Sequence, residues 1–297
     1  MPESRQSPSN SLQKQDSWSS SLGRNVTSQC FEDGILEGIF EIIPGSGDRW
    51  CVEFGAWDGK YMSNSWRLIT EKKWAGVMIE GSPKRYKDLQ KTYQDYKKVI
   101  CVNKLVNFDG EDRLDRILAA TPTPQDFDLL SIDIDGNDYH IWDSLKSYNP
   151  KVVVIEFNPT IPPEVEFIQP RNLQVNQGCS LLSLYKLGKD KGYELIATTL
   201  INAIFVQKKY FPMFHIADNT PAVIHRDRSL QTQIFQLFDG TLVLTGCKKF
   251  LWHNLDMAQD KIQLVPRFFR TYPENYSGLQ KMVLSVLRII MKIFRMR

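Results

Sequence analysis

The sequence lacks several features that would assign it at once to a familiar class. Its five cysteines form no C-x-x-C pair, and their odd number predicts reduced thiols rather than a disulfide framework. No apolar secretory segment follows the polar, serine-rich first residues, so a cytoplasmic protein is expected. The dinucleotide-binding pattern G-x-G-x-x-G is also missing, which disfavours an NAD-linked oxidoreductase.

An excess of charge of one sign is missing too. The chain has 37 Lys and Arg against 34 Asp and Glu, a net charge of +3, and no basic cluster interleaved with aromatics lies in its central part. Nucleic acid is therefore not an expected partner. A length of 297 residues with 42% hydrophobic residues fits one large α/β domain with an appendage, and excludes a disulfide-stapled mini-protein, a collagen-like chain and a wholly disordered one.

Composition divides the chain into four regions. Residues 1–22 contain eight serines and almost no apolar periodicity, which predicts a disordered tail. A folded domain is expected over residues 23–210, followed by a C-terminal extension over 211–277 and a basic amphipathic helix over 278–297.

Strand-like and helix-like segments alternate within the predicted domain. Short apolar runs typical of buried parallel strands cover residues 50–55, 75–80, 98–103, 127–133 and 151–157. Helical segments are expected at residues 31–43, 62–72, 83–94, 110–119, 138–147 and 180–192, and a proline-containing loop at 158–179. Two adjacent strands, 193–199 and 202–208, can pair only antiparallel. This order predicts a Rossmann-like α/β fold of the class I methyltransferase type, mostly parallel with an antiparallel last strand and helices on both faces.

The end of the first strand carries a candidate ligand turn. Gly55 and Gly59 would let a ligand approach the backbone, while Glu53 and Asp58 place carboxylates where a pyrophosphate would have to sit. Like charge argues against a phosphate ligand and for one with cationic groups, such as the sulfonium and ammonium of S-adenosylmethionine. The alternative is an ordinary strand-to-helix turn with surface acids.

The ends of the second and third strands offer polar side chains to the same ligand. Glu80 ends the second strand and can accept hydrogen bonds from both ribose hydroxyls of an adenosine group. Asn103 or Asn107, after the third strand, would face the adenine. Alternatively, Glu80 is a solvated strand-end acid and the asparagines form turns.

Three carboxylates and a histidine follow the fourth strand. Asp133, Asp135 and Asp138 lie within six residues around Gly136, and such close carboxylates repel each other unless a cation, a proton or hydrogen bonds intervene. Asp135 and Asp138 are candidate catalytic bases, and His140 is the natural general base near neutral pH. Asp138 could instead cap the following helix.

A metal site is a further possibility. Glu156 and Asn158 leave the fifth strand, and with Asp133 they would form an all-oxygen site suited to Mg²⁺. The alternative is plain turn chemistry before Pro159.

Six strings of the sequence together resemble the FkbM-type methyltransferase family over roughly residues 28–210: SQCFEDGILEGIF, CVEFGAWDGKYMSNSWRL, GVMIEGSPKRYKDL, LLSIDIDGNDYHIW, VVVIEFNPTIPP and LLSLYKLGKDKGYELI. The resemblance implies a class I Rossmann-like fold, S-adenosylmethionine as methyl donor and O-methylation, usually of sugar hydroxyls on glycolipids or natural products. In that family the fourth strand reads approximately K-I-D-V-E-G-x-E. Here Ser131 replaces the Lys, whereas Asp133, Asp135 and Asp138 stand at the three acidic positions.

The C-terminal helix suggests a second partner. Lys281, Ser285, Arg288, Lys292 and Arg295 fall on one stripe of a helix whose other positions are largely apolar. Charges interrupt the apolar run, so the helix should not span a bilayer; it could lie on an anionic membrane, dock on the domain or bind a partner helix.

The sequence therefore predicts an S-adenosylmethionine-dependent O-methyltransferase. It would act on a small-molecule or glycan hydroxyl, in the cytoplasm or as a peripheral membrane protein. Loop 158–179 would cover the site and help to select the acceptor. The alternative is a non-catalytic module that keeps the nucleotide fold as a scaffold.

Overall fold

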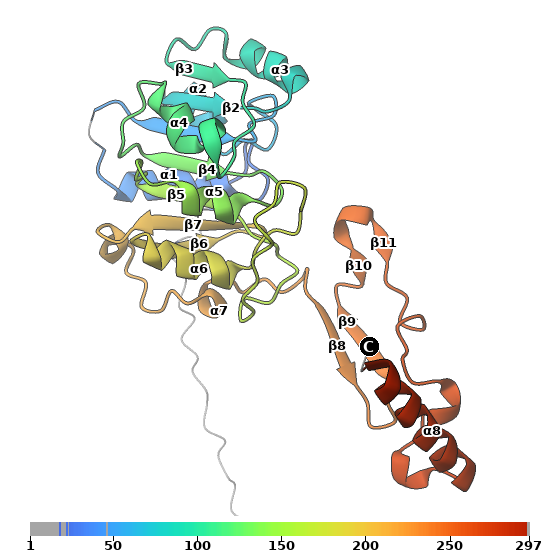
Figure 1. Cartoon of the computed structure of the whole chain (residues 1–297). Helices are drawn as coiled ribbons and strands as arrows, with labels where there is room; N and C mark the ends of the chain where they lie inside the picture. Colours follow the sequence, from blue (N-terminus) through green and yellow to red (C-terminus); the bar gives the residue numbers. More distant parts are fainter. Residues whose placement is uncertain (1–17, 19–21, 23, 46, 296–297) are drawn as a thin grey trace, which may run out of the picture. The chain divides into compact units, whose positions relative to one another are not determined.

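The computed structural model describes residues 18, 22, 24–45 and 47–295, with side chains in the C-terminal helix described as far as Ile289 (Figure 1). The disordered tail expected over residues 1–22 lies outside the described residues, apart from Trp18 and Leu22. The indole N–H of Trp18 donates to the Ile196 carbonyl at 2.9 Å, and its ring contacts the ring of Phe214.

A seven-stranded sheet forms the centre of the first part of the chain, in the order β3-β2-β1-β4-β5-β7-β6 (Figure 1). The strands are β1 Trp50–Phe54, β2 Ala75–Ile79, β3 Val99–Val102, β4 Leu129–Ile132, β5 Val152–Glu156, β6 Tyr193–Thr198 and β7 Asn202–Gln207. The first five are parallel, and β7 runs antiparallel between β5 and β6. The mostly parallel sheet predicted from the sequence is confirmed, including its antiparallel last strand.

Helices cover both faces of this sheet. They are α1 Glu32–Ile42, α2 Trp66–Thr70, α3 Pro83–Tyr93, α4 Leu114–Ala119, α5 Asp138–Ser144, α6 Leu181–Asp190 and the short α7 Pro221–Ile224. Apolar residues of α1, α2 and α3 join one buried cluster, and those of α4, α5 and α6 join another. Successive side chains along a strand point to opposite faces of the sheet. Each cluster therefore contains the strand side chains of one face.

Helix α5 ends at Ser144 rather than at residue 147, because Leu145 is extended. Two other helices differ from their expected bounds for local reasons. Helix α2 begins at Trp66 rather than at residue 62, because Ser63, Asn64 and Ser65 bond to the Glu53 carboxylate instead of entering the helix. The segment expected as one helix over 110–119 divides into a 3₁₀ turn, η1 Gly110–Asp112, and α4, since Arg113 between them is extended.

Contacts divide the chain after Arg226 into residues 1–226 and 227–297. The first unit therefore continues past residue 210 through η2 Phe211–Phe214 and α7. The second contains β8 Thr232–Gln236, β9 Leu242–Gly246, β10 Lys249–Phe250, β11 Leu255–Asp256 and α8 Gly278–Arg295, with 3₁₀ turns η3 Leu251–His253, η4 Arg267–Phe269 and η5 Pro273–Asn275. Helix α8 begins where the sequence predicts a helix. Among the described residues, no helix combines the length and apolar character needed to cross a membrane.

Candidate active site

The candidate site lies where the parallel strands end. In open α/β sheets, ligands bind outside the carboxyl ends of the strands, at the point where the strand order reverses. Here that point lies between β1 and β4, which pair directly in parallel. The predicted residues after β1, β2, β4 and β5 therefore share one edge of the sheet.

Gly55 makes the turn at the end of β1. It has φ +74° and is exposed, and a Cβ atom placed on it would lie only 1.8 Å from the Asp133 carbonyl oxygen. Both the left-handed backbone and this close approach to the end of β4 require glycine. The turn leaves exposed backbone beside Asp133, where a ligand can reach it.

Gly59 and Asp58 shape the rest of this turn. The Tyr93 hydroxyl donates to the Gly59 carbonyl at 2.7 Å, and a Cβ on Gly59 would lie 2.5 Å from the Tyr93 ring. One carboxylate oxygen of Asp58 accepts from the backbone N–H groups of Lys60, at 2.9 Å, and Tyr61, at 2.7 Å. In the structure, Asp58 thus stabilises the turn.

Glu53 is buried, and both of its carboxylate oxygens have partners. Oε1 accepts from the Asn64 N–H at 2.9 Å, and Oε2 accepts from the hydroxyls of Ser63, at 2.6 Å, and Ser65. Burial raises the pKa of Glu53 above its usual range, against these hydrogen bonds. Its carboxylate holds the segment that leads into α2.

Ser131 lies directly opposite Glu53 in the pairing of β1 with β4. Its hydroxyl accepts from the Asn64 side-chain amide at 3.0 Å, and it is buried. A lysine at this position would stand beside Glu53. In this chain, hydroxyls and the Asn64 amide occupy that place.

Glu80 connects the ends of β1 and β2. Its carboxylate accepts from the backbone N–H of Trp57 at 2.9 Å and from that of Ser82 at 2.7 Å. Asn103 donates its side-chain amide to the Glu80 carbonyl at 2.7 Å. Asn107, by contrast, accepts from the Phe108 N–H at 2.7 Å and forms a local turn. Glu80 and Asn103 are therefore neighbours at the strand ends, and Asn107 is a turn residue.

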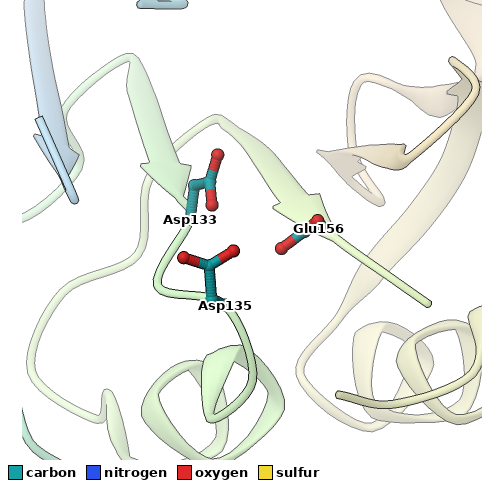
Figure 2. Close-up of side chains that lie close together, drawn as sticks. All are labelled: Asp133, Asp135 and Glu156. Atoms are coloured by element: carbon teal, nitrogen blue, oxygen red, sulfur yellow. The ribbon is translucent and has the colours of Figure 1, made fainter. Parts of the chain in front are cut away.

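Three carboxylates converge at the ends of β4 and β5 (Figure 2). An oxygen from each of Asp133, Asp135 and Glu156 lies within 4.8 Å of the others, and the side chains point toward a common space. Desolvation and the neighbouring carboxylates raise the pKa of Asp133 to about 7 and that of Glu156 to about 9. No cation from the described protein residues pairs with any of the three in a salt bridge.

Asp138 and Asn158 lie nearby but have other partners. The buried Asp138 carboxylate accepts from the N–H groups of Ile134, at 2.9 Å, and Gly136, at 2.8 Å, so it closes the loop before α5. The Asn158 amide oxygen accepts from both the N–H and the hydroxyl of Thr160. Of the three residues predicted as metal ligands, the structure brings Asp133 and Glu156 together, and Asp135 is their third neighbour.

Comparison with known proteins gives a family match that includes part of this edge of the sheet. Residues 110–195 match the model of the methyltransferase FkbM domain. This part of the chain is therefore similar to a methyltransferase FkbM domain. The matched range includes Asp133, Asp135, Asp138 and Glu156, whereas the turn at Gly55 and Glu80 precede it.

Solved structures similar to this chain share little sequence with it. The citrinin polyketide synthase CMeT domain is 13% identical, with 60% of this chain and 51% of that chain covered and a TM-score of 0.40. The N-terminal domain of EvdMO1 with SAH bound is 10% identical, with 64% and 84% covered and a TM-score of 0.40. M. jannaschii TYW2 in complex with AdoMet is 15% identical, with 62% and 79% covered and a TM-score of 0.35.

The chain spans about half the length of the citrinin synthase structure and of the CurJ carbon methyltransferase structure. A search of the curated proteins finds no match to this chain.

Loop 158–179 is held beside the candidate site by contacts that local sequence patterns do not predict. His140 bonds through Nε2 to the Gln169 carbonyl at 2.9 Å, so this nitrogen carries the proton. The buried Gln169 side chain accepts from the N–H groups of Gln177 and Gly178, both at 2.8 Å. Asn176 donates to the Asp135 carbonyl at 2.8 Å. No local pattern marks these residues, because their partners lie about 10 to 40 positions away in sequence.

Proposed function

We propose that the protein is an S-adenosylmethionine-dependent O-methyltransferase of a hydroxyl acceptor. The observation that carries this proposal is the exposed Gly55 turn, packed against Asp133 and next to a cluster of three carboxylates that has no cationic partner among the described residues. A negatively charged edge at the strand ends favours a ligand with cationic groups and disfavours a pyrophosphate.

The donor would be held by residues of the first two strand ends. The Gly55 backbone leaves room for close approach, and each Glu80 oxygen retains a lone pair for a ribose hydroxyl beside the one used by the backbone. The Asn103 side-chain amide donates to the carbonyls of Glu80 and Gly81, and so fixes the backbone beside the proposed position of the adenine. Glu53, whose oxygens are occupied, would act by positioning the turn. S-adenosylmethionine supplies an electrophilic methyl group on its sulfonium.

Asp133, in the cluster that it forms with Asp135 and Glu156, would accept the proton of the hydroxyl. A carboxylate whose pKa lies near neutral pH is a more effective base than an ordinary one, and Asp133 has a pKa of about 7. His140 and Asp138 are predicted bases as well, but His140 Nε2 and both Asp138 oxygens are engaged in holding loops. Their role under this proposal is to position the segment over residues 134–138.

A divalent cation is the second candidate for the same cluster. Carboxylate oxygens suit Mg²⁺, and the three side chains already converge. The Asn158 oxygen, the third predicted ligand, is bonded to Thr160 instead. This favours proton transfer without a metal.

The acceptor proposed here is a sugar or glycolipid hydroxyl, which the family resemblance implies. Loop 158–179 would contribute to its selection, since it is anchored on both His140 and the Asp135 carbonyl. The basic helix α8 would bring a lipid-linked acceptor within reach by lying on an anionic membrane surface.

Calorimetric titration with S-adenosylmethionine, S-adenosylhomocysteine and NAD tests the proposal. We expect both sulfur ligands to bind and NAD not to bind. A scaffold that only keeps the fold would bind none of them. Binding of the sulfur ligands that survives Gly55→Val would also contradict the proposed donor site, since that side chain must clash with Asp133.

A further inference from the structure

Residues 227–297 bury few apolar side chains of their own. Among the described residues of this unit, only Leu244 and Phe269 are buried hydrophobics. Cys247 is a free thiol, so no disulfide compensates within the unit. A folded segment of this size normally needs a larger core, which indicates that another surface covers it in use.

The exposed apolar side chains gather on two hairpin arms, β8–β9 and β10–η3–β11. Phe238, in the turn between β8 and β9, is 90% exposed, and Trp252 in η3 is 65% exposed. Others on these arms are Ile234, Phe235, Leu237, Phe250 and Leu255, each more than 40% exposed. So many exposed large apolar side chains within one short segment indicate surfaces that are covered in use.

Helix α8 adds a second apolar surface. Leu279, Met282, Val286 and Ile289 recur at helical spacing on one side, and each is more than half exposed. Lys281 and Arg288 fall on a different stripe of the same helix, so the helix has separate apolar and basic faces. This arrangement is typical of helices that lie in the interface of a membrane.

Charge decides which kind of surface fits. Residues 227–297 contain eleven Lys and Arg and five Asp and Glu, a net charge of +6, so residues 1–226 carry −3. No acidic residue follows Glu274. On the arms, Lys248 and Lys249 are balanced by Asp239 and Asp256, so the whole excess lies in residues 257–297. That segment supplies the attraction to an anionic bilayer, and the arms supply the aromatic rings that lie at its headgroup level.

We infer that the two hairpin arms, residues 232–256, insert aromatic side chains into the interface of an anionic membrane. This goes beyond the contact proposed for α8, because it assigns a separate lipid-binding surface to the strands. It is also independent of methyl transfer. A second copy of the chain is the competing occupant.

Vesicle binding by the full chain tests the inference. The protein should bind vesicles of phosphatidylcholine with phosphatidylglycerol and bind phosphatidylcholine alone weakly. The double variant Phe250→Ser, Trp252→Ser should bind the anionic vesicles at least about tenfold more weakly although α8 is unchanged, because two large side chains no longer leave water. Met213→Ser, which removes a 40% exposed side chain from the first unit, is the matched control and should bind as the parent does.

Tryptophan fluorescence provides a measurement that does not depend on a disruptive variant. The parent emission should shift to shorter wavelength on adding anionic vesicles, and Trp252→Phe should bind equally well with a smaller shift. Retention of the whole shift in Trp252→Phe, or unchanged binding of the double variant, overturns the inference. So does self-association without lipid that the double variant abolishes, since a second copy would then cover the arms.

Discussion

The acidic residues at the strand ends differ in how many hydrogen bonds their carboxylate oxygens already accept. Glu53 has both oxygens engaged by three residues of the following turn, whereas each Glu80 oxygen accepts one backbone N–H. Asp135 is exposed, and Asp133 is half-buried beside Glu156. Their positions in the sequence look equivalent. Glu53 and Glu80 are both buried, so their hydrogen bonds, rather than burial, distinguish the positioning residue from the one that can meet a ligand.

Replacing Glu80 tests the donor site. Loss of a charged acceptor for a bound ligand costs about 1.5 to 3 kcal/mol, so Glu80→Ala should weaken S-adenosylhomocysteine binding roughly 10- to 100-fold by calorimetry. Glu71→Ala, a change outside the strand ends, is the control and should bind normally. Unchanged affinity in a folded Glu80→Ala variant would exclude this role.

Chelation separates a carboxylate base from a metal. We expect EDTA to leave turnover unchanged, measured as S-adenosylhomocysteine release with a sugar or glycolipid acceptor. Asp133→Asn should lower kcat by about 10² to 10⁴, and activity should rise with pH through about 7 as the Asp133 carboxyl ionises. His140→Ala should cost less than Asp133→Asn. Activity that EDTA removes and Mg²⁺ restores would contradict the metal-free version.

Glu156 should make stability depend on pH. Its pKa is raised to about 9 in the folded protein, so the folded state favours the proton. The associated stability is present at acidic pH and is lost as pH rises through about 9. In urea unfolding, Glu156→Gln should therefore exceed the parent in free energy of unfolding by on the order of 1 kcal/mol or more at pH 9, with a smaller difference at pH 5. Parallel pH profiles for both proteins would refute this.

At the scale of elements, loop 158–179 is more ordered than its composition suggests. Four prolines and little periodicity predict a loop, and the structure agrees. Gln169 nevertheless bonds within the loop, and its carbonyl bonds to His140 of α5. Side-chain bonds across long sequence separations position this loop beside the carboxylate cluster.

The composition of helix α8 leads to a separate prediction about vesicle binding. Basic residues on one stripe and exposed apolar residues elsewhere predict adsorption to anionic lipid. In co-sedimentation at low salt, the full chain should pellet with anionic vesicles, and a chain ending at residue 277 should bind them at least about tenfold less. High salt should weaken the binding of the full chain. Equal sedimentation of the two chains would remove α8 from the membrane contact.

In the molecule as a whole, buried apolar side chains and net charge are distributed unequally between the two units. Both large hydrophobic clusters belong to residues 1–226, together with every residue of the proposed site, whereas the net positive charge belongs to residues 227–297. Catalysis and attachment to a surface are thus proposed for different parts of the chain.

This division predicts that donor binding survives removal of the second unit. A chain ending at residue 230 should retain a cooperative thermal transition and bind S-adenosylhomocysteine with a Kd within about threefold of that of the full chain, since such a difference is below 1 kcal/mol. Calorimetry of both chains checks this. Loss of binding by a folded, shortened chain would show that residues 231–297 complete the site.

The order of strands and helices follows from the sequence alone, because apolar runs, turn residues and helical spacing are local patterns. The sequence also places Glu53, Gly55, Glu80, Asp133 and Glu156 at strand ends, which parallel pairing brings to one edge. Only the tertiary structure decided which of these carboxylates is engaged and which is available. Glu53 is held by Ser63 and Ser65, and Asp138 by its own loop, whereas Asp133, Asp135 and Glu156 converge. Hydrogen-bond partners and desolvation depend on distances in space, and spacing along the chain does not encode them.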